Sequence, residues 1–230
     1  MTDLFPLATT DDELERRAEV AVLPVGSFEQ HGPYLPLSTD AVIASTVAAA
    51  IAAAYPVLHL PPITISCSHE HAAWPGTVSI SARTLHAVVT DIADSLSRSG
   101  VERLVLVNGH GGNYVLSNVV QESVRPMALF PGLADWTAAH EAAGLRTSLD
   151  DDMHAGELET SLLLHAHPHL VRPGYEAADH VTERDHLLTL GLRAYTESGV
   201  VGRPSLATAA KGHVLLDTLV QRFAEVLEVL

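Results

Sequence analysis

The chain has 230 residues, a formal net charge of −15 and a single cysteine, Cys67. The length suits one domain over residues 1–230, whose core needs neither disulfides nor a structural metal for bulk stability. The acidic balance argues against nucleic acid or an anionic membrane as a partner, and one cysteine excludes an intramolecular disulfide and a cysteine-rich zinc site.

No segment approaches the roughly 20 apolar residues of a membrane span. Residues 1–17 are acidic and lack the basic region and apolar run of a secretory signal. A cytoplasmic protein is therefore the expectation.

Strand-like and helix-like apolar patterns alternate along the chain. Strands are expected at residues 20–25, 57–60 with 63–65, 101–107 and 127–130. Helices are expected at residues 11–17, 41–54, 81–97, 114–123, 155–166 and 213–230. Residues 167–205 are rich in glycine and proline and contain no domain linker. This alternation predicts a three-layer αβα fold with a mainly parallel central sheet.

The loop at residues 26–40 combines Glu29, His31 and Asp40 with several glycines and prolines. It leaves an apolar strand and enters an alanine-rich helix, which is where α/β proteins bind ligands. Carboxylate and imidazole groups together are typical ligands of borderline divalent metals. Asp40 also has a simpler interpretation, because an aspartate or Thr39 at this position can cap the helix.

A second candidate loop, residues 108–113, follows the clearest strand and holds His110 between glycines. It matches neither phosphate-loop pattern, so His110 is a candidate metal ligand. Further on, His154 and Glu157 are three residues apart and would share one face of a regular helix, whereas Glu159 would point away. Glu159 could then bond a metal ligand or cap a loop, and both glutamates could equally belong to a solvated first turn.

The segment His69-Glu70-His71 does not complete a metalloprotease H-E-x-x-H pattern, because position 73 is alanine. These residues either line a pocket or lie in a surface loop. No G-x-S-x-G elbow or serine triad is visible.

Four sequence blocks together resemble the creatininase (creatinine amidohydrolase) family. They are Gly-Ser-Phe-Glu-Gln-His-Gly-Pro at 26–33 with Thr39-Asp40, Trp-Pro-Gly-Thr at 74–77, Asn-Gly-His-Gly-Gly-Asn at 108–113, and His-Ala-Gly-Glu-Leu-Glu-Thr-Ser at 154–161. The blocks occur in family order over about residues 20–213, and Lys211-Gly212 is a weaker match.

The resemblance implies a creatininase-like α/β fold with two divalent metal ions at the carboxyl ends of the parallel strands. By position, the family's metal ligands are Glu29, His31, Asp40 and His110, with Asp40 bridging the ions. Creatininase itself carries a ligand glutamate where this chain has Gly112, so the missing carboxylate must come from elsewhere. Glu157 is the candidate for this fifth ligand, and together with His154 it is also expected to be a catalytic residue.

By the same resemblance, His154 matches the catalytic histidine, and His71 and Trp74 would shape the substrate pocket. A metal-bridging hydroxide would attack an amide carbon while His154 stabilises the oxyanion or protonates the leaving nitrogen. The ligand types suit Zn, Mn and Fe alike. Family relatives are often hexameric, which suggests a homo-oligomer.

The expected function is a metal-dependent amidohydrolase that cleaves a C–N bond of a small amide, including a cyclic amide or formamide, in a biosynthetic pathway. Because of Gly112, creatinine is disfavoured as the substrate. Alternatives on the same scaffold are a creatinine hydrolase, a peptidase that trims a precursor peptide, and a lactonase. A metal-binding regulatory protein without turnover is the alternative from outside the enzymes.

Overall fold

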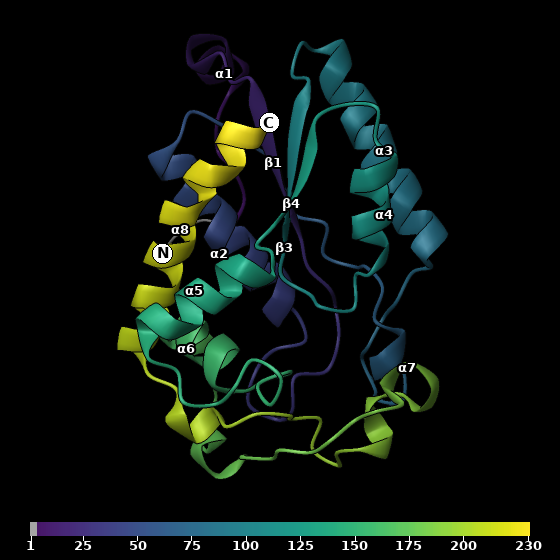
Figure 1. Ribbon diagram of the computed structural model, residues 1–230, viewed down its shortest axis with the longest axis vertical. Coiled ribbons are helices and arrows are strands. Elements are labelled where there is room, and N and C mark those ends of the chain that lie inside the picture. The colour runs from purple at the N-terminus through teal and green to yellow at the C-terminus, as the bar shows by residue number, and fades with distance from the viewer. Residues whose placement is uncertain (1–3) are drawn as a thin grey trace.

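The computed structural model describes residues 4–230 and has the expected layered α/β architecture. Four parallel strands form the central sheet in the order β2-β1-β3-β4, and helices cover both of its faces (Figure 1). The strands are β1 (Val20–Val25), β2 (Leu58–His59), β3 (Arg103–Asn108) and β4 (Met127–Phe130). The α-helices are α1 (Thr10–Arg16), α2 (Thr39–Ala54), α3 (Ala82–Arg98), α4 (Val115–Glu122), α5 (Leu133–Ala143), α6 (Glu157–Ala166), α7 (Leu187–Leu190) and α8 (Ala209–Val229).

The two central strands bury side chains on both faces, because successive residues of a strand point in opposite directions. Val105 and Val107 of β3 belong to the core beneath α2, α5, α6 and α8. Leu104 and Leu106 belong to the core beneath α3 and α4. Figure 1 shows these two helical layers on opposite sides of the sheet. Within the described residues no helix has the length and apolar composition to span a membrane.

Several predicted boundaries shift for local reasons. Strand β2 has only two residues, and Ile63 forms an isolated bridge to Val25, because the intervening prolines cannot donate to a ladder. Helix α8 begins earlier than predicted, at Ala209, where the Thr208 side chain caps it. The N-cap of α1 is Thr9, whereas the sequence predicts Thr10 or Asp11. The N-cap of α2 is Ser38, whereas the sequence predicts Thr39 or Asp40.

The sequence pattern does not predict helix α5, and it predicts that α6 starts at Ala155, two residues before its observed start at Glu157. The weak apolar periodicity of residues 133–143 accounts for the first difference. In the second, His154 pairs with Val201 in an isolated antiparallel bridge, and Ala155 has a positive φ of 52°. His154 therefore precedes the helix instead of lying on it.

The carboxyl ends of β1 and β3 are neighbours in the sheet, with Val25 opposite Asn108. The next residue of each chain segment is a glycine that the first turn of α2 approaches closely. A Cβ on Gly26 would lie 2.2 Å from the Ala41 backbone nitrogen, and one on Gly109 would lie 2.4 Å from the Asp40 carbonyl oxygen. Both glycines are therefore required for α2 to begin against the ends of the two strands.

Helix α8 should contribute much of the stability through Phe223. This fully buried ring packs 5.4 Å, centroid to centroid, from both Tyr55 and Phe130. We expect Phe223→Ala to lower the free energy of unfolding by about 3–5 kcal/mol, because it leaves a cavity in the core. Urea denaturation followed by circular dichroism measures this loss. Val229→Ala on the same helix, at an exposed position, should change it by less than about 0.5 kcal/mol, and equal losses would contradict the packing described.

Candidate metal centre

Asp40 lies at the centre of the polar cluster, in the first turn of α2, and its side chain is only 1% exposed. The Ser27 hydroxyl donates a 2.7 Å hydrogen bond to Asp40 Oδ2. His31 Nε2 lies 2.9 Å from Oδ1, and His110 Nδ1 lies 3.1 Å from Oδ2. Burial opposes ionisation, but these two imidazoles outweigh it and hold the pKa of Asp40 well below its usual range. The carboxylate is therefore charged and faces a different histidine with each oxygen.

Two sets of potential metal ligands share Asp40. Glu29, Asp40 and His110 form one set, and His31, Asp40 and Glu159 form the other, with the donor atoms of each set within 4.8 Å of one another. A third such group joins Glu29 and His31 to His154. The structure thus brings together Glu29, His31, Asp40 and His110, as the sequence suggested, and its shared aspartate has the arrangement that a bridging ligand requires.

Backbone carbonyls fix which nitrogen each imidazole presents to the cluster. His31 Nδ1 donates to the Glu29 carbonyl at 3.0 Å, which leaves Nε2 facing Asp40. His110 Nε2 donates to the Cys67 carbonyl at 2.8 Å, which leaves Nδ1 facing Asp40. Such an oriented imidazole is the usual form of a metal-binding histidine.

Glu29 provides the test of whether a cation fits. Its side chain is fully buried, and neither carboxylate oxygen has a hydrogen-bond partner among the described residues. Burial and the charge of Asp40 raise the pKa of Glu29 to about 8. A buried carboxylate without donors is costly unless a cation neutralises it. The donor set therefore fits divalent metal ions.

His154 comes from the segment before α6 and reaches the same cluster. Its Nε2 donates to the Gln30 carbonyl at 2.6 Å, so its free Nδ1, 3.8 Å from Glu29 Oε1, faces the ligands. Burial, together with the charge of His31, lowers the pKa of His154 well below its ordinary value. His154 is therefore a neutral imidazole whose lone pair points at the centre.

His71 is held differently, by the side chain of Gln30. Gln30 Oε1 accepts from Gly32 N, so its Nε2 is the group that donates to His71 Nδ1, at 2.9 Å. The remaining proton of neutral His71 is then on Nε2, 3.1 Å from Glu29 Oε1. Burial lowers the pKa of His71 to about 3, so it stays neutral. His71 lines the cavity beside the cluster but has no free lone pair for a metal.

The structure does not bring Glu157 to the cluster. Its carboxylate accepts hydrogen bonds from the backbone and hydroxyl of Thr147 and from the Arg146 backbone, and it forms an ion pair with Lys211. Burial raises the pKa of Glu157, but the Lys211 and Thr147 hydrogen bonds outweigh it and lower the pKa. The face predicted to hold both His154 and Glu157 requires regular helical backbone between them, whereas α6 begins only at Glu157, so the shared face does not exist.

Glu159 takes the position that the sequence analysis gave to Glu157. Its Oε1 lies 4.0 Å from His31 Nε2, and its Oε2 accepts a 2.6 Å hydrogen bond from Ala155 N. Burial raises the pKa of Glu159 to about 7. The motif already contained this residue, and only the true start of α6, at Glu157, turns it toward the cluster.

A further carboxylate, Glu70, fills the space beside Gly112. A Cβ at Gly112 would lie 1.9 Å from Glu70 Oε1, which in turn lies 3.5 Å from His110 Nε2. Glu70 belongs to a 3₁₀ turn, η1 (His69–His71), that the sequence analysis left open between pocket and surface loop. The His-Glu-His pattern was the only sequence signal for it.

The cluster opens into a cavity of about 230 Å³. His71, His110, His154 and Glu159 line it. Trp74, which the resemblance placed in the substrate pocket, lies outside the lining of this cavity and of the larger neighbouring one. Its ring instead packs against the Arg193 guanidinium, 5.3 Å from the centroid.

Comparison with known proteins identifies the family of this chain. Residues 8–227 match the family described as Creatininase: Creatinine amidohydrolase. The chain belongs to this family. The crystal structure of creatinine amidohydrolase (creatininase) has a TM-score of 0.81 and 27% identity, over 98% of this chain and 96% of that chain.

Relatives of the chain include hydrolases with different substrates. The mycofactocin precursor peptide peptidase of Mycobacterium ulcerans (strain Agy99) is 34% identical over 233 residues, which cover 94% of this chain and 89% of the relative. The creatinine amidohydrolase of Pseudomonas putida is 26% identical over 229 residues, covering 90% and 87%. The predicted family, fold class and enzyme class, a metal-dependent hydrolase, are confirmed.

The cluster predicts how pH affects the metal-free protein. Burial raises the pKa of Glu29 to about 8 and that of Glu159 to about 7. Burial lowers but neighbouring carboxylates raise the pKa values of His31 and His110, to about 10 and about 9. All four groups hold protons in the folded state that the unfolded chain releases. Stability should therefore fall as pH rises through these values.

We expect the free energy of unfolding of chelator-treated protein to decrease between about pH 7 and pH 9. His71 and His154, whose pKa values are lowered, titrate below this window and do not oppose the trend. Urea denaturation at several pH values measures it. Saturating divalent ion should flatten the curve, because the ion replaces the protons. A metal-free stability that increases across this window would contradict the described electrostatics.

Proposed function

We propose that this protein hydrolyses a carbon–nitrogen bond of an amide substrate, using two divalent ions held by Glu29, His31, Asp40, His110 and Glu159. The observation that carries the proposal is the pair of ligand sets that share Asp40. Buried Glu29 supports the proposal, because within the described residues neither of its carboxylate oxygens has a hydrogen-bond partner, although His71 and His110 lie 3.1 and 3.2 Å away. Zn, Mn and Fe all suit ligands of this kind.

When bound, divalent ions would lower the pKa of a water and polarise the scissile carbonyl. The protein's own contribution is a positioned proton acceptor. His154 Nε2 is committed to the Gln30 carbonyl, so Nδ1 can take a proton from the attacking water. The water oxygen bonds to the amide carbon, the carbon–nitrogen bond breaks, and His154 returns the proton to the leaving nitrogen.

This assignment favours one of the two roles considered for His154. Stabilising an oxyanion directly would require a proton on Nδ1, and the neutral tautomer has none there. Gln30 supports this role from two sides, because its backbone carbonyl orients His154 and its side chain orients His71. Gln30 is thus a positioning residue in the proposal.

The substrate is proposed as a small amide, and a peptide bond of a precursor peptide is the second candidate. The second candidate is favoured by the greater similarity to the precursor peptide peptidase, at 34% identity, than to the creatinine amidohydrolase, at 26%. Creatinine itself is disfavoured, because Glu70 occupies the space beside Gly112. The same chemistry cleaves both kinds of amide.

The central test measures hydrolysis of a panel of small amides and short peptides by metal-loaded wild-type protein and His154→Ala. We expect the variant to lose about 10²–10⁴-fold in kcat, the usual contribution of general acid–base catalysis. Mass spectrometry should find about two divalent ions per chain in both proteins, because His154 is not one of the proposed ligands. Equal turnover would contradict the role of His154, and fewer than one ion per chain would contradict the dinuclear centre.

A matched pair of variants tests which glutamate of α6 serves the metals. Glu159→Gln should weaken binding of one ion tenfold or more, because it removes a proposed ligand charge. Glu157→Gln should retain both ions but lower the free energy of unfolding by about 2–3 kcal/mol, because it breaks the ion pair with Lys211. Metal titration calorimetry and urea denaturation give the two readouts. If Glu157→Gln lost an ion and Glu159→Gln retained both, Glu157 rather than Glu159 would be the metal ligand.

A further inference from the structure

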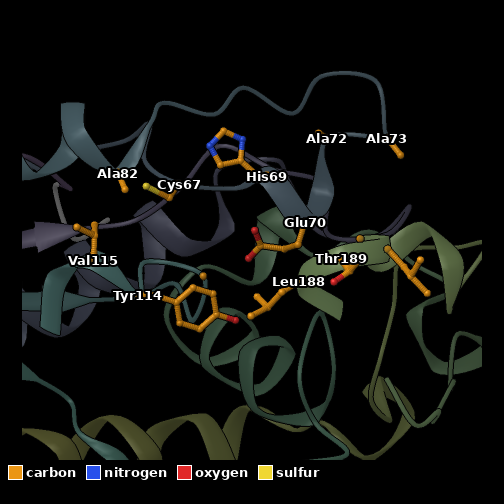
Figure 2. Close-up of a pocket in the computed structure, with 13 residues that line it drawn as sticks. Cys67, His69, Glu70, Ala72, Ala73, Ala82, Tyr114, Val115, Leu188 and Thr189 are labelled. Atoms are coloured by element: carbon orange, nitrogen blue, oxygen red, sulfur yellow. The ribbon is translucent and has the colours of Figure 1, made fainter. Parts of the chain in front are cut away.

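A second, larger cavity of about 520 Å³ adjoins the metal-side cavity. Most of its wall is apolar, contributed by Ala72, Ala73, Ala82, Val115, Leu188 and Leu190. Figure 2 shows the side chains of Glu70, Tyr114 and Leu188 pointing toward one another across it. Its volume lies within the range of small-molecule binding sites, and its lining has their typical composition.

Several apolar side chains at the rim of this cavity are exposed to solvent. Leu188 and Leu190 of the short helix α7 are 78% and 57% exposed, although both line the cavity. Tyr114, on the opposite wall, is 58% exposed. Several large apolar groups gathered around one hollow indicate a binding surface more strongly than scattered exposed residues do.

The large cavity adjoins the cavity beside the metal centre. Glu70, Gly112 and Tyr114 line both. Glu70, which fills the space beside Gly112, lies at the boundary between the two cavities, with its carboxylate 3.5 Å from His110 Nε2. An attached group on an amide bound at the cluster could therefore reach the large cavity by passing the Glu70 side chain.

We propose that the large cavity binds an apolar substituent, of the size of a leucine side chain, on the amide that is cleaved at the neighbouring cluster. The inference rests on the proposed function and narrows its substrate class. The apolar wall and the Glu70 carboxylate exclude an anionic substituent, because its buried charge would be unpaired and would face a second negative charge. The substituent can belong to a free small amide or to a residue of a peptide.

The test is a binding measurement with two probes that cannot be hydrolysed. They are the ketone isosteres of N-acetyl-leucinamide and N-acetylglycinamide, in which carbon replaces each amide nitrogen. Titration calorimetry with the purified protein should show the leucine probe binding about tenfold or more tightly than the glycine probe, as expected for burial of an isobutyl group. Extending the leucine probe by one glycine at each end separates the sources, since only a peptide site tolerates the extension.

Two tryptophan substitutions on helix α3 provide the matched control. Ala82 lines the cavity, so Ala82→Trp should fill it and abolish the preference for leucine. Ala87 is also exposed on α3 but does not line the cavity, so Ala87→Trp should preserve the preference. Both substitutions are at exposed helical positions, and circular dichroism confirms that each variant folds.

Equal binding of the two probes, or a leucine preference that survives in Ala82→Trp, would overturn the inference. So would an Ala82→Trp variant that changes the oligomeric state in light scattering while the probes bind as before, because the cavity would then be a contact between copies of the chain. The probes contain no bond that hydrolysis can cleave. A leucine preference in a protein that cleaves no amide would therefore refute the proposed function, while still showing that the large cavity binds an apolar group of this size.

Discussion

The site depends on one buried negative charge, the Asp40 carboxylate at the start of α2. A carboxylate that is 1% exposed needs compensation from every side. The helix N-terminus, the Ser27 hydroxyl and the imidazoles of His31 and His110 supply it. This compensation is possible only because Gly26 and Gly109 let α2 begin against the ends of β1 and β3. The glycines of the two sequence blocks are therefore structural requirements of the same carboxylate that the proposed metals would share.

Backbone carbonyls near Asp40 fix which ring nitrogen of each histidine faces the cluster. Three buried imidazoles each donate one N–H to a main-chain carbonyl, His31 to Glu29, His110 to Cys67 and His154 to Gln30. Each therefore presents one fixed ring nitrogen to the cluster. In His154 this nitrogen has a free lone pair, whereas His31 and His110 carry a proton there in the metal-free protein and would release it to a metal ion. Two of these carbonyls belong to Glu29, a proposed ligand, and to the adjacent Gln30, so one short loop both supplies ligands and orients histidines. Residues 26–33 are a distinctive sequence block because the same segment supplies ligands and orients neighbouring histidines.

The sequence was sufficient where local pattern and tertiary structure agree. The continuous apolar runs of β1 and β4 predicted those strands to the residue, and the loop after β1 predicted Glu29, His31 and Asp40 as neighbours. It was insufficient where a boundary decides which way a side chain points. A helix that begins at Glu157 rather than Ala155 turns Glu159 inward and leaves Glu157 to Lys211, a residue 54 positions away. No rule based on residue spacing predicts that long-range ion pair. None predicts that the Glu70 side chain lies beside Gly112.

The position of Glu70 beside Gly112 bears on how one fold can act on different amides. A carboxylate that projects from residue 112 would come from the loop that also carries His110, and its Cβ would occupy the space where Glu70 now ends. Glycine at 112 gives that space to a side chain from η1, on the opposite wall of the cavity. Glu29, His31, Asp40 and His110 come from other positions, so the ligand sets that share Asp40 form in this chain without a carboxylate at residue 112. Glycine at 112 therefore changes both the carboxylate that lies beside His110, here Glu70, and the shape of the space in front of the cluster.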